Sequence, residues 1–216
     1  MCGRYSLKTD YETLARRFHA EPSSTTSASR YNISPTQSVP VIRNVRPNQI
    51  ELASWGIIPV WDKKKTIINA RKDSLDKPTF KKSFHERRCL ILADGFYEWQ
   101  KPDGAGPKRP FRFVLKSEEP FAFAGIWRED EEGDEPCCAI ITTEANSLVR
   151  PVHDRMPAIL LPEVEADWLN LDTSPEQVLE LLQPYPDSEM KAYEISRLIN
   201  SPANDSPDVI TPMRAS

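Results

Sequence analysis

The sequence predicts an α+β fold: a single compact domain in which a mostly antiparallel β-sheet forms a barrel-like core and helices lie at the periphery. The chain has 216 residues, which suits one domain or two small ones. Its middle is typical of consecutive strands rather than strands alternating with long helices, and this disfavours a doubly wound parallel sheet. No repeat, low-complexity tract or linker divides it. Residues 1–216 are therefore expected to form one domain, with the residues after about 200 as a tail that packs on it or stays partly flexible.

The individual elements follow from apolar periodicity and turn-forming residues. Residues 9–20 predict a helix, because Thr9 and Glu12 have capping-box spacing and apolar residues recur at helical intervals. A Ser/Thr-rich loop is expected at 21–29. Eight apolar segments are then typical of strands, at 38–43, 49–55, 65–70, 87–94, 96–100, 110–116, 121–127 and 137–143.

Strong turn signals separate these strands, above all at 101–110 and in the acidic stretch 129–136. The last regular elements expected are one strand and two helices, at 156–161, 163–171 and 174–183. The final helix has a complete start signal, with Ser174 as the cap, Pro175 in the first turn and Gln177 closing a capping box.

Composition and cysteine use exclude several classes of protein. Hydrophobic residues make up 39% of the chain and charged residues 28%, which argues against a disordered or fibrous protein. No apolar stretch approaches the roughly 20 residues of a membrane span, and the first ten residues lack the apolar core of a signal peptide. A cytoplasmic protein with no membrane partner is therefore predicted.

The cysteines and histidines do not have metal-site spacing. The four cysteines form no CxxC pair, and none of the three histidines lies at zinc-finger distance from them, so no metal site is predicted. Cys89, Cys137 and Cys138 lie in apolar runs and are expected to be reduced core residues.

The charge of the chain is unevenly divided along its length. Residues 1–116 contain 22 basic and 11 acidic residues, whereas residues 117–216 contain 6 and 21. The densest positive segment, 63–88, has ten basic and three acidic residues. Such a division suits a nucleic-acid-binding face backed by an acidic one, although on charge alone an ordinary solvated surface is the better explanation.

Cys2 is the first candidate for chemistry. Removal of Met1 would leave one residue with both a free α-amine and a thiol, whose reference pKa values are about 8 and about 8.5. An N-terminal nucleophile can use its own amine as the base. With an aldehyde, the amine forms an imine, the thiolate adds to it, and a five-membered thiazolidine closes. From position alone, a cysteine at residue 2 more often has no special role.

Glu98 and His153 are candidate acid–base groups. Glu98 stands between Tyr97 and Trp99 in an apolar strand and points to the opposite face from both. Partial burial would raise the pKa of its carboxyl toward acid–base use, but an edge-strand glutamate facing water fits as well. His153 could stabilise an oxyanion or move a proton, although a lone histidine is more often structural.

Two further pairs suit contacts with a nucleic acid. Asn69 and Arg71 alternate on one strand face, where an amide and a guanidinium suit a phosphate and a hydroxyl or base edge, or equally a turn. Trp55 and Trp61 bracket a segment just before the basic cluster. Exposed aromatic residues beside positive charge form stacking platforms for single strands. Core packing is expected for Trp55 and exposure for Trp61.

Taken together, the motifs resemble one known family. Seven segments occur in that family's order and spacing: MCGRYSL, RYNISPTQ (30–37), WGIIPVW (55–61), INARKDS (68–74), RRCLILADGFYEW (87–99), AIITTEAN (139–146) and VHDRMP (152–157). They are similar to those of the SOS response-associated peptidase (SRAP) family over essentially the whole chain. The resemblance implies an α+β domain around a barrel-like sheet, with a positively charged active-site cleft. It also implies recognition of abasic sites in single-stranded DNA and a thiazolidine crosslink through Cys2 that shields the lesion.

The resemblance also implies roles for individual residues. Cys2 would be the nucleophile, Glu98 the acid–base group that opens the deoxyribose, Asn69 the residue that positions the Cys2 amine and the sugar, and His153 a hydroxyl stabiliser or proton carrier. DNA contacts would come from Arg4, Asn32, Pro35, Trp61, Arg71, Thr142 and Arg155. One departure concerns base stacking, because many members have a second tryptophan where this chain has Asp62.

The predicted activity is thus abasic-site processing with crosslinking or lyase-type chemistry, without a cofactor, by a monomer located at damaged DNA. No protein partner can be inferred. Two alternatives stay open. One is a cysteine-type peptidase, including self-removal of Met1, because a cysteine with histidine and glutamate can run acyl transfer. The other is a non-catalytic module that binds single-stranded or modified DNA through a basic groove.

Overall fold

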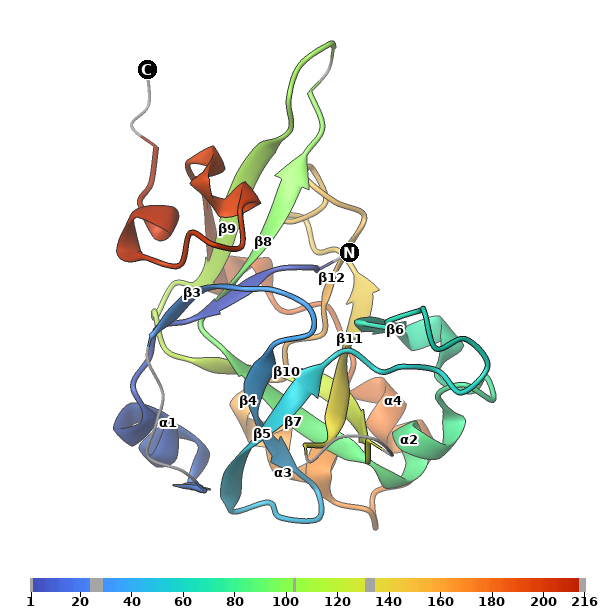
Figure 1. Ribbon diagram of the computed structural model, residues 1–216. Helices are drawn as coiled ribbons and strands as arrows, with labels where there is room; N and C mark the ends of the chain where they lie inside the picture. The colour runs from blue at the N-terminus through green and yellow to red at the C-terminus, as the bar shows by residue number, and fades with distance from the viewer. Residues whose placement is uncertain (1, 24–28, 103, 131–134, 214–216) are drawn as a thin grey trace.

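The computed structural model describes residues 2–23, 29–102, 104–130 and 135–213, which fold into two sheets with short peripheral helices (Figure 1). The smaller sheet has the order β13 (Met190–Glu194), β9 (Arg109–Leu115), β8 (Gly95–Gln100), β1 (Tyr5–Leu7) and β3 (Arg30–Ile33). The larger has the order β12 (Arg155–Pro157), β11 (Cys137–Glu144), β10 (Phe121–Arg128), β7 (Arg88–Ala93), β4 (Ser38–Arg43), β5 (Gln49–Trp55) and β2 (Glu21–Pro22), and β6 (Asn69–Arg71) pairs with β11. The α+β class is confirmed.

Part of the larger sheet closes on itself. Antiparallel pairings link β11, β10, β7, β4 and β5 in turn, and β5 then pairs with β11 in parallel. This last pairing joins only Cys137 to Ser54 and Cys138 to Trp55. The predicted barrel-like core is therefore a ring of strands with one short closing contact rather than a regular barrel. Its interior is apolar, and Trp55 within it has no exposed surface, as expected.

The helices are shorter than the sequence pattern predicts. They are α1 (Tyr11–Phe18), α2 (Lys81–Glu86), α3 (Glu165–Leu169) and α4 (Pro175–Glu180), with 3-10 turns at Lys72–Ser74, Pro162–Val164, Asp187–Glu189, Arg197–Asn200 and Pro207–Ile210. The capping box of Ser174 and Gln177 on α4 is confirmed. The predicted cap at Thr9 is wrong, because Asp10 accepts the hydrogen bond from the Thr13 backbone N–H and the helix begins one residue later.

Several strands also differ from the expectation. The predicted strand 65–70 is mostly irregular, with an isolated bridge from Ile67 to Ile57 before β6 begins. The predicted strand 156–161 ends at Pro157, and Ile159 makes only an isolated bridge. Strands β1, β3 and β13 and helix α2 were not predicted, and β2 lies at the start of the predicted loop 21–29. Parts of the predicted turns, at 24–28, 103 and 131–134, lie outside the described residues.

A buried carboxylate fixes the N-terminal strand against the larger sheet. Asp94 accepts hydrogen bonds from Ser6 Oγ at 2.7 Å, from the backbone N–H groups of Lys8 and Thr9 at 2.5 and 3.0 Å, and from Arg112 Nη2 at 3.0 Å. Its side chain is 1% exposed and that of Arg112 is 5% exposed. Because β1 directly follows the segment that carries Cys2, this network helps to set where Cys2 lies.

Replacing Asp94 by alanine is expected to lower the free energy of unfolding by about 3–5 kcal/mol, because the Arg112 guanidinium would stay buried without its partner. Denaturant unfolding checks this. Glu194→Ala is the matched control, since it breaks the more exposed pair with Arg109 and should cost under about 1 kcal/mol. Equal losses for the two variants would contradict the anchoring role of Asp94.

No helix within the described ranges is long and apolar enough to cross a lipid bilayer. The four cysteines are free and buried, as expected for Cys89, Cys137 and Cys138.

Candidate active site

The candidate site consists of four residues that are distant in the sequence: Cys2, Asn69, Glu98 and His153. They lie where the N-terminal segment enters the smaller sheet. The backbone N–H of Tyr97 donates to the Arg4 carbonyl at 3.0 Å, so residues 2–4 run beside β8. From the other side, Asn69 Nδ2 on β6 donates to the Cys2 carbonyl at 2.8 Å. Glu98, next along β8, lies close enough for its charge to raise the pKa of the Cys2 thiol. Strands of both sheets thus position Cys2 between an amide and a carboxylate.

Cys2 is held in a protonated, shielded state in this chain. It has no exposed surface, and its Sγ lies 3.6 Å from the Arg4 carbonyl. Burial, and to a lesser extent the nearby Glu98 charge, raises the pKa of the thiol far above its ordinary value. Because the sequence still carries Met1, the nitrogen of Cys2 is here an amide and not an amine.

Asn69 uses only one end of its side-chain amide within the described structure. Its Nδ2 holds the Cys2 carbonyl, while its Oδ1 is buried with no hydrogen-bond partner among the described residues. A buried acceptor left open costs free energy. Because the same side-chain amide holds the Cys2 carbonyl, this acceptor lies close to residue 2.

Glu98 is a buried carboxylate. It is 4% exposed, and burial, the largest influence on it, raises the pKa of its carboxyl, opposed in part by the charge of His153. Gly95, at the start of the same strand, instead makes room for the Arg112 guanidinium, because a Cβ there would lie 2.8 Å from it. A carboxyl whose pKa is raised by burial is better suited than an ordinary one both to donate and to accept a proton.

Replacing Glu98 by glutamine should stabilise the fold at neutral pH. Folding raises the pKa of the Glu98 carboxyl above its value in the unfolded chain. The protonated carboxyl therefore contributes its full stability below the unfolded pKa, and this contribution is lost as the pH rises through the folded pKa. Glutamine carries no charge to bury, so the variant should have the higher melting temperature at neutral pH, and the difference should fade toward acid. Thermal melts across pH measure this.

Glu51→Gln provides a control of opposite sign. Burial works against ionisation of Glu51, but hydrogen bonds and charge from Arg43 and Arg46 outweigh it and lower the pKa of the carboxyl. That variant should therefore lose stability at neutral pH, with the effect disappearing as pH falls through the lowered pKa. A destabilised Glu98→Gln at neutral pH would contradict the raised pKa of the Glu98 carboxyl.

His153 faces Glu98 across a polar cleft. Both residues line a cavity of about 600 Å³ together with Lys101, Lys108, Arg150 and the backbone around them. His153 Nδ1 lies 3.0 Å from the Arg155 backbone nitrogen and 2.9 Å from Asp154 Oδ1. An Nδ1 without a proton accepts in the first contact, and an Nδ1–H donates in the second. Both contacts hold the ring beside the cleft.

Arg71, Thr142 and Arg155 form a second group beside this site. Register places Arg71 on β6 next to Thr142 on β11. Arg155 Nη2 donates to the Thr142 carbonyl at 2.5 Å and to its hydroxyl at 2.9 Å. Arg71 is exposed and paired with Asp73. Thr142 has no exposed surface, so its placement supports Arg155 rather than offering a direct contact.

Arg4 and Asn32 hold the C-terminal segment. Arg4 Nη1 donates to Asn32 Oδ1 at 2.6 Å and to the Ile199 carbonyl at 2.9 Å. Asn32 has no exposed surface, and its Nδ2 donates to the carbonyls of Ser201 and Asn204 at 2.9 and 2.7 Å. The structure thus does not bring Asn32 to an open surface. Residues after 200 pack on β3 through these bonds.

Pro35 and Trp61 lie in connecting segments. Pro35 is half-buried in the turn between β3 and β4. Trp61 is 61% exposed, as expected, and its neighbour Val60 is 75% exposed.

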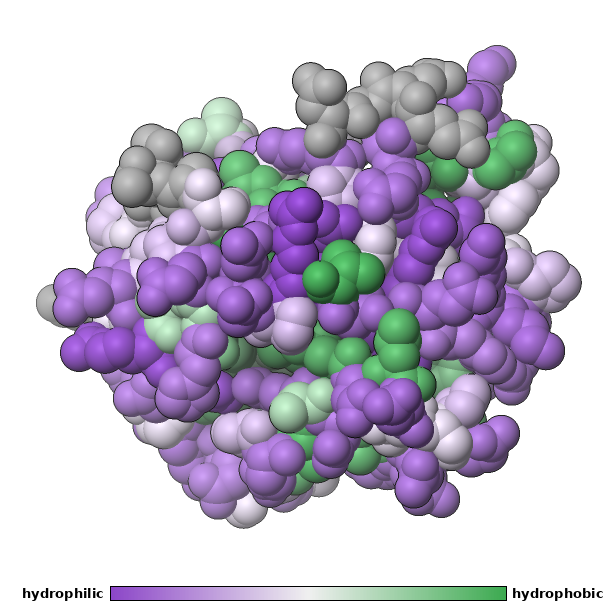
Figure 2. All heavy atoms as spheres, turned by 90° about the horizontal axis from the view of Figure 1, so that it is seen from below, coloured by the Kyte–Doolittle hydropathy of each residue, from purple (hydrophilic) through white to green (hydrophobic). Residues whose placement is uncertain are grey.

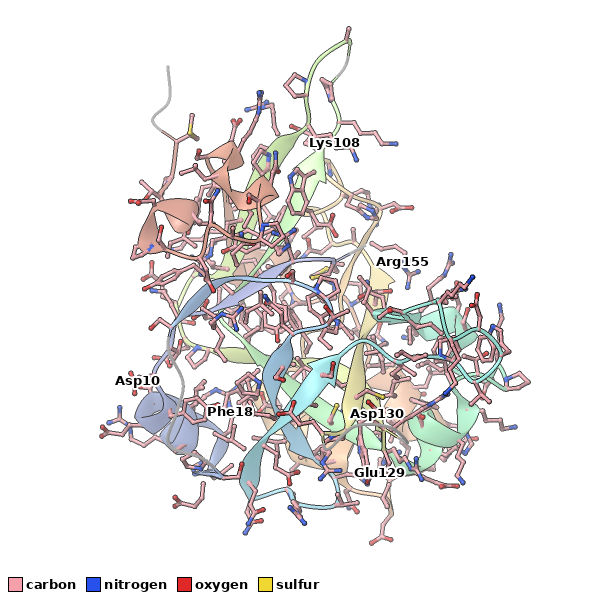
Figure 3. All side chains as sticks on the ribbon, in the orientation of Figure 1. Asp10, Phe18, Lys108, Glu129, Asp130 and Arg155 are labelled. Atoms are coloured by element: carbon pink, nitrogen blue, oxygen red, sulfur yellow. The ribbon has the colours of Figure 1, made fainter. Side chains whose placement is uncertain are left out.

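Sequence patterns did not identify the basic residues of the cleft. Lys101 and Lys108 belong to the β8–β9 hairpin, and Arg150 belongs to the loop before His153 (Figure 3 labels Lys108 and Arg155). Gln100 on β8 donates to the Pro151 carbonyl at 3.2 Å and so ties this loop to the hairpin. These lysines flank a turn signal, and only the strand register shows that they face one cavity.

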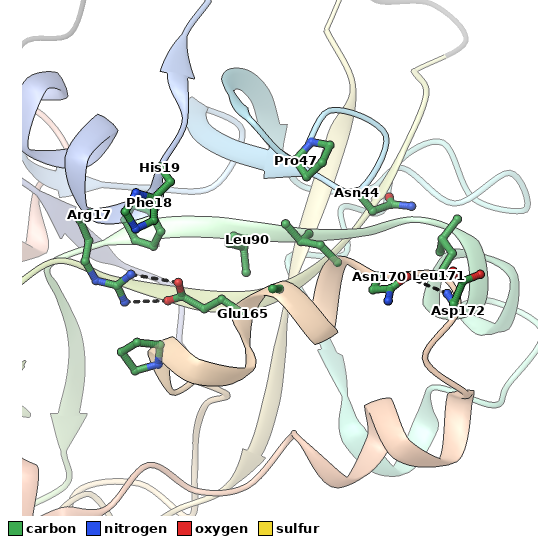
Figure 4. Close-up of a pocket in the computed structure, with 13 residues that line it drawn as sticks. Arg17, Phe18, His19, Asn44, Pro47, Leu90, Glu165, Asn170, Leu171 and Asp172 are labelled. Carbon is green, nitrogen blue, oxygen red and sulfur yellow. Dashed lines mark hydrogen bonds and ion pairs between the residues drawn. The ribbon is translucent and has the colours of Figure 1, made fainter.

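A larger cavity of about 900 Å³ lies elsewhere, between α1, α3 and the β4–β5 turn (Figure 4). Phe18, Leu90 and Leu169 give it apolar walls, and Arg17 forms a two-bonded ion pair with Glu165 at its edge. None of the predicted site residues lines it. The molecule seen from below is mostly hydrophilic, with separate hydrophobic patches (Figure 2). No group of three or more potential metal ligands occurs among the residues that the structure describes.

Comparison with known proteins places this geometry in context. A family model described as "SOS response associated peptidase (SRAP)" matches residues 1–202. The chain is 41% identical to the abasic site processing protein YoqW of Bacillus subtilis (strain 168), over 97% of this chain and 99% of that protein. It is 28% identical to the abasic site processing protein YedK of Escherichia coli (strain K12), over 99% and 100%. A crystal structure of a protein from Bacteroides thetaiotaomicron shares the fold with a TM-score of 0.86 and 26% identity, covering 99% of this chain and 100% of that one.

Proposed function

The chain belongs to the SRAP family, and on that premise we propose that it processes abasic sites in single-stranded DNA by capturing them covalently through Cys2 once Met1 has been removed. The convergence of Cys2, Asn69, Glu98 and His153 carries the proposal. Two of them are tied together by the 2.8 Å bond from Asn69 to the Cys2 carbonyl, and the other two share one cleft.

The chemistry uses the open-chain aldehyde of the abasic deoxyribose. Ring opening breaks the C1′–O4′ bond, with a proton delivered to O4′ and one taken from the C1′ hydroxyl. The Cys2 amine then adds to C1′, and loss of water gives an imine. Addition of the Cys2 sulfur to the imine carbon closes the thiazolidine, while the thiol proton passes to the ring nitrogen. The net change is loss of one water molecule, with no oxidation or reduction.

Glu98 and His153 suit the proton transfers in this sequence. The raised pKa of Glu98 lets it deliver a proton to O4′ and accept one from the C1′ hydroxyl. His153 can stabilise the opened hydroxyl from the opposite wall of the cleft. Because the sulfur closes the ring by adding to the imine carbon, amine attack precedes sulfur addition, and the thiol loses its proton as the ring closes.

Substrate recognition would combine a low free-energy cost of distorting the DNA with electrostatic attraction. An abasic nucleotide has no base to unstack, so its sugar enters the cleft at low cost. Arg71 and Arg155 would hold phosphates beside it, and the exposed Trp61 would stack on a neighbouring base. Phosphate contacts make non-covalent binding weaken steeply with salt, whereas a finished crosslink should be insensitive to salt.

A denaturing gel tests the proposal. Processed protein is mixed with single-stranded DNA carrying one abasic site, and undamaged DNA of the same sequence is the control. A heat-stable shifted band with damaged DNA alone supports covalent capture. No band, despite a free Cys2 terminus shown by mass spectrometry, would overturn it. Cys2-dependent peptide cleavage would then favour a peptidase, and salt-sensitive binding alone would favour a passive DNA-binding module.

A further inference from the structure

The β8–β9 hairpin carries two lysines that the fold places against each other. Trp99 pairs with Pro110 and Gln100 with Arg109 in this antiparallel hairpin. Lys101 and Lys108 are the first residues beyond this pairing, one on each side of the turn, and both line one cavity. Directly opposed side chains typically have Cβ atoms about 5 Å apart, and two like charges at such a position destabilise a hairpin.

Neither lysine is neutralised within the part of the chain that the structure describes. Both are exposed, and neither has a hydrogen bond or ion pair with a described residue. The next residue on the same hairpin behaves differently, because Arg109 is paired with Glu194 on β13. The hairpin therefore keeps one cation paired with an acid and leaves two unpaired cations side by side.

A third cation joins them at the same cavity. Arg150 is exposed and lines the cleft of about 600 Å³ with both lysines, Glu98 and His153. Its Nη2 donates to the Ala145 carbonyl at 3.1 Å, which holds the guanidinium in place without cancelling its charge. Gln100 fixes the Arg150 loop to the hairpin through the Pro151 carbonyl. Three positive charges thus converge on the proposed reaction centre from two linked segments.

We propose that Lys101, Lys108 and Arg150 form a phosphate-binding wall that holds the DNA backbone on one side of the abasic nucleotide. Arg71 and Arg155 belong to a separate group on β6 and β12. A strand crossing the site would then be held on both sides of the reacting sugar. The inference rests on the proposed function for the identity of the polyanion, while the wall itself rests on the opposed lysines and the shared cleft.

Binding of undamaged single-stranded DNA tests the wall without any chemistry. Each phosphate contact adds about 0.7 to the slope of log affinity against log salt for single strands. The Lys101→Gln, Lys108→Gln double variant should therefore lower the slope by about 1.4 and weaken affinity roughly 20-fold at 0.1 M salt. The control is the Arg109→Gln, Lys116→Gln double variant, which also removes two positive charges, one on the same hairpin and one beyond the far end of β9, and it should leave the slope unchanged.

The double variant is also expected to fold normally, because it removes a like-charge pair. Its melting temperature should equal or exceed that of the parent. If the control variant lowers the salt slope by as much as the lysine double variant does, the effect is a diffuse electrostatic field, and the proposed phosphate-binding wall is overturned. A lower melting temperature would overturn the argument from opposed charges.

Two abasic oligonucleotides locate the wall along the strand. One has nucleotides only on the 5′ side of the lesion and the other only on the 3′ side. The double variant should slow crosslinking of one of them and leave the other at the parental rate, and equal slowing of both would overturn a one-sided wall. If the parent forms no crosslink with either, the proposed function fails, while the salt slopes still decide whether the wall binds phosphate.

Discussion

Replacing Cys2 by serine should abolish the heat-stable adduct with abasic DNA and leave salt-sensitive binding of the same DNA at the parental level. Serine keeps the α-amine, so the imine can still form, but an imine hydrolyses readily and its yield on a denaturing gel should fall to background. The hydroxyl is too weakly acidic to replace the thiol in ring closure. Adduct yield and binding affinity, measured on the same oligonucleotide, separate the two steps.

Cys137→Ser is the matched control for this experiment. Cys137 is also a free cysteine, 8% exposed and on the far end of β11 from Thr142, so its replacement tests for general effects of losing a thiol. It should crosslink normally. A Cys2→Ser protein with the parental adduct yield would contradict the role of the thiol. A Cys2→Ser protein that loses both the adduct and the binding of DNA would indicate that Cys2 acts on the fold.

Blocking the α-amine of Cys2 should have an equally large effect. A chain made with a short leader ahead of Cys2 has an amide at that nitrogen and cannot form an imine, so crosslinking should be undetectable. Cleavage of the leader by a site-specific protease to expose Cys2 should restore the adduct in the same sample. The measurement is the adduct yield before and after cleavage, with N-terminal identity followed by mass spectrometry.

The leader experiment also tests which amine of the protein reacts. The thiol has no exposed surface and a strongly raised pKa in the chain that carries Met1. Crosslinking by the leader-bearing protein at the processed rate would contradict the thiazolidine mechanism and would transfer the reaction to another amine, such as a lysine of the cleft.

Strong local signals made most of the fold predictable from the sequence. Strands 38–43 and 49–55 have the observed bounds because β-branched and apolar residues end at clear turn residues. Strand β1 was missed because three residues carry no detectable periodicity, and it forms only through its neighbours and the Asp94 network. Helix α1 is capped by Asp10 rather than Thr9, because the Thr9 N–H and hydroxyl already bind Asp94.

The candidate site was predicted from the motifs of the family rather than from local structural signals. Motifs of the family carried Cys2, Asn69, Glu98 and His153, and the structure shows how two sheets bring these segments together. The sequence could not show that Asn32 is fully buried by the C-terminal segment, because that contact joins residues more than 160 positions apart. It also could not show that Lys101 and Lys108 face one cavity, since this depends on hairpin register.

The central claim is that both reactive atoms of Cys2 become bonded to one sugar carbon. The most direct test is the intact mass of the purified adduct before and after treatment with borohydride. The account predicts the mass of the chain without Met1 plus the oligonucleotide, less one water molecule, and no change on treatment, because a thiazolidine has no imine to reduce. A gain of two hydrogen atoms would reveal an open imine, and an adduct that retains Met1 would exclude the Cys2 amine, so either result would contradict it.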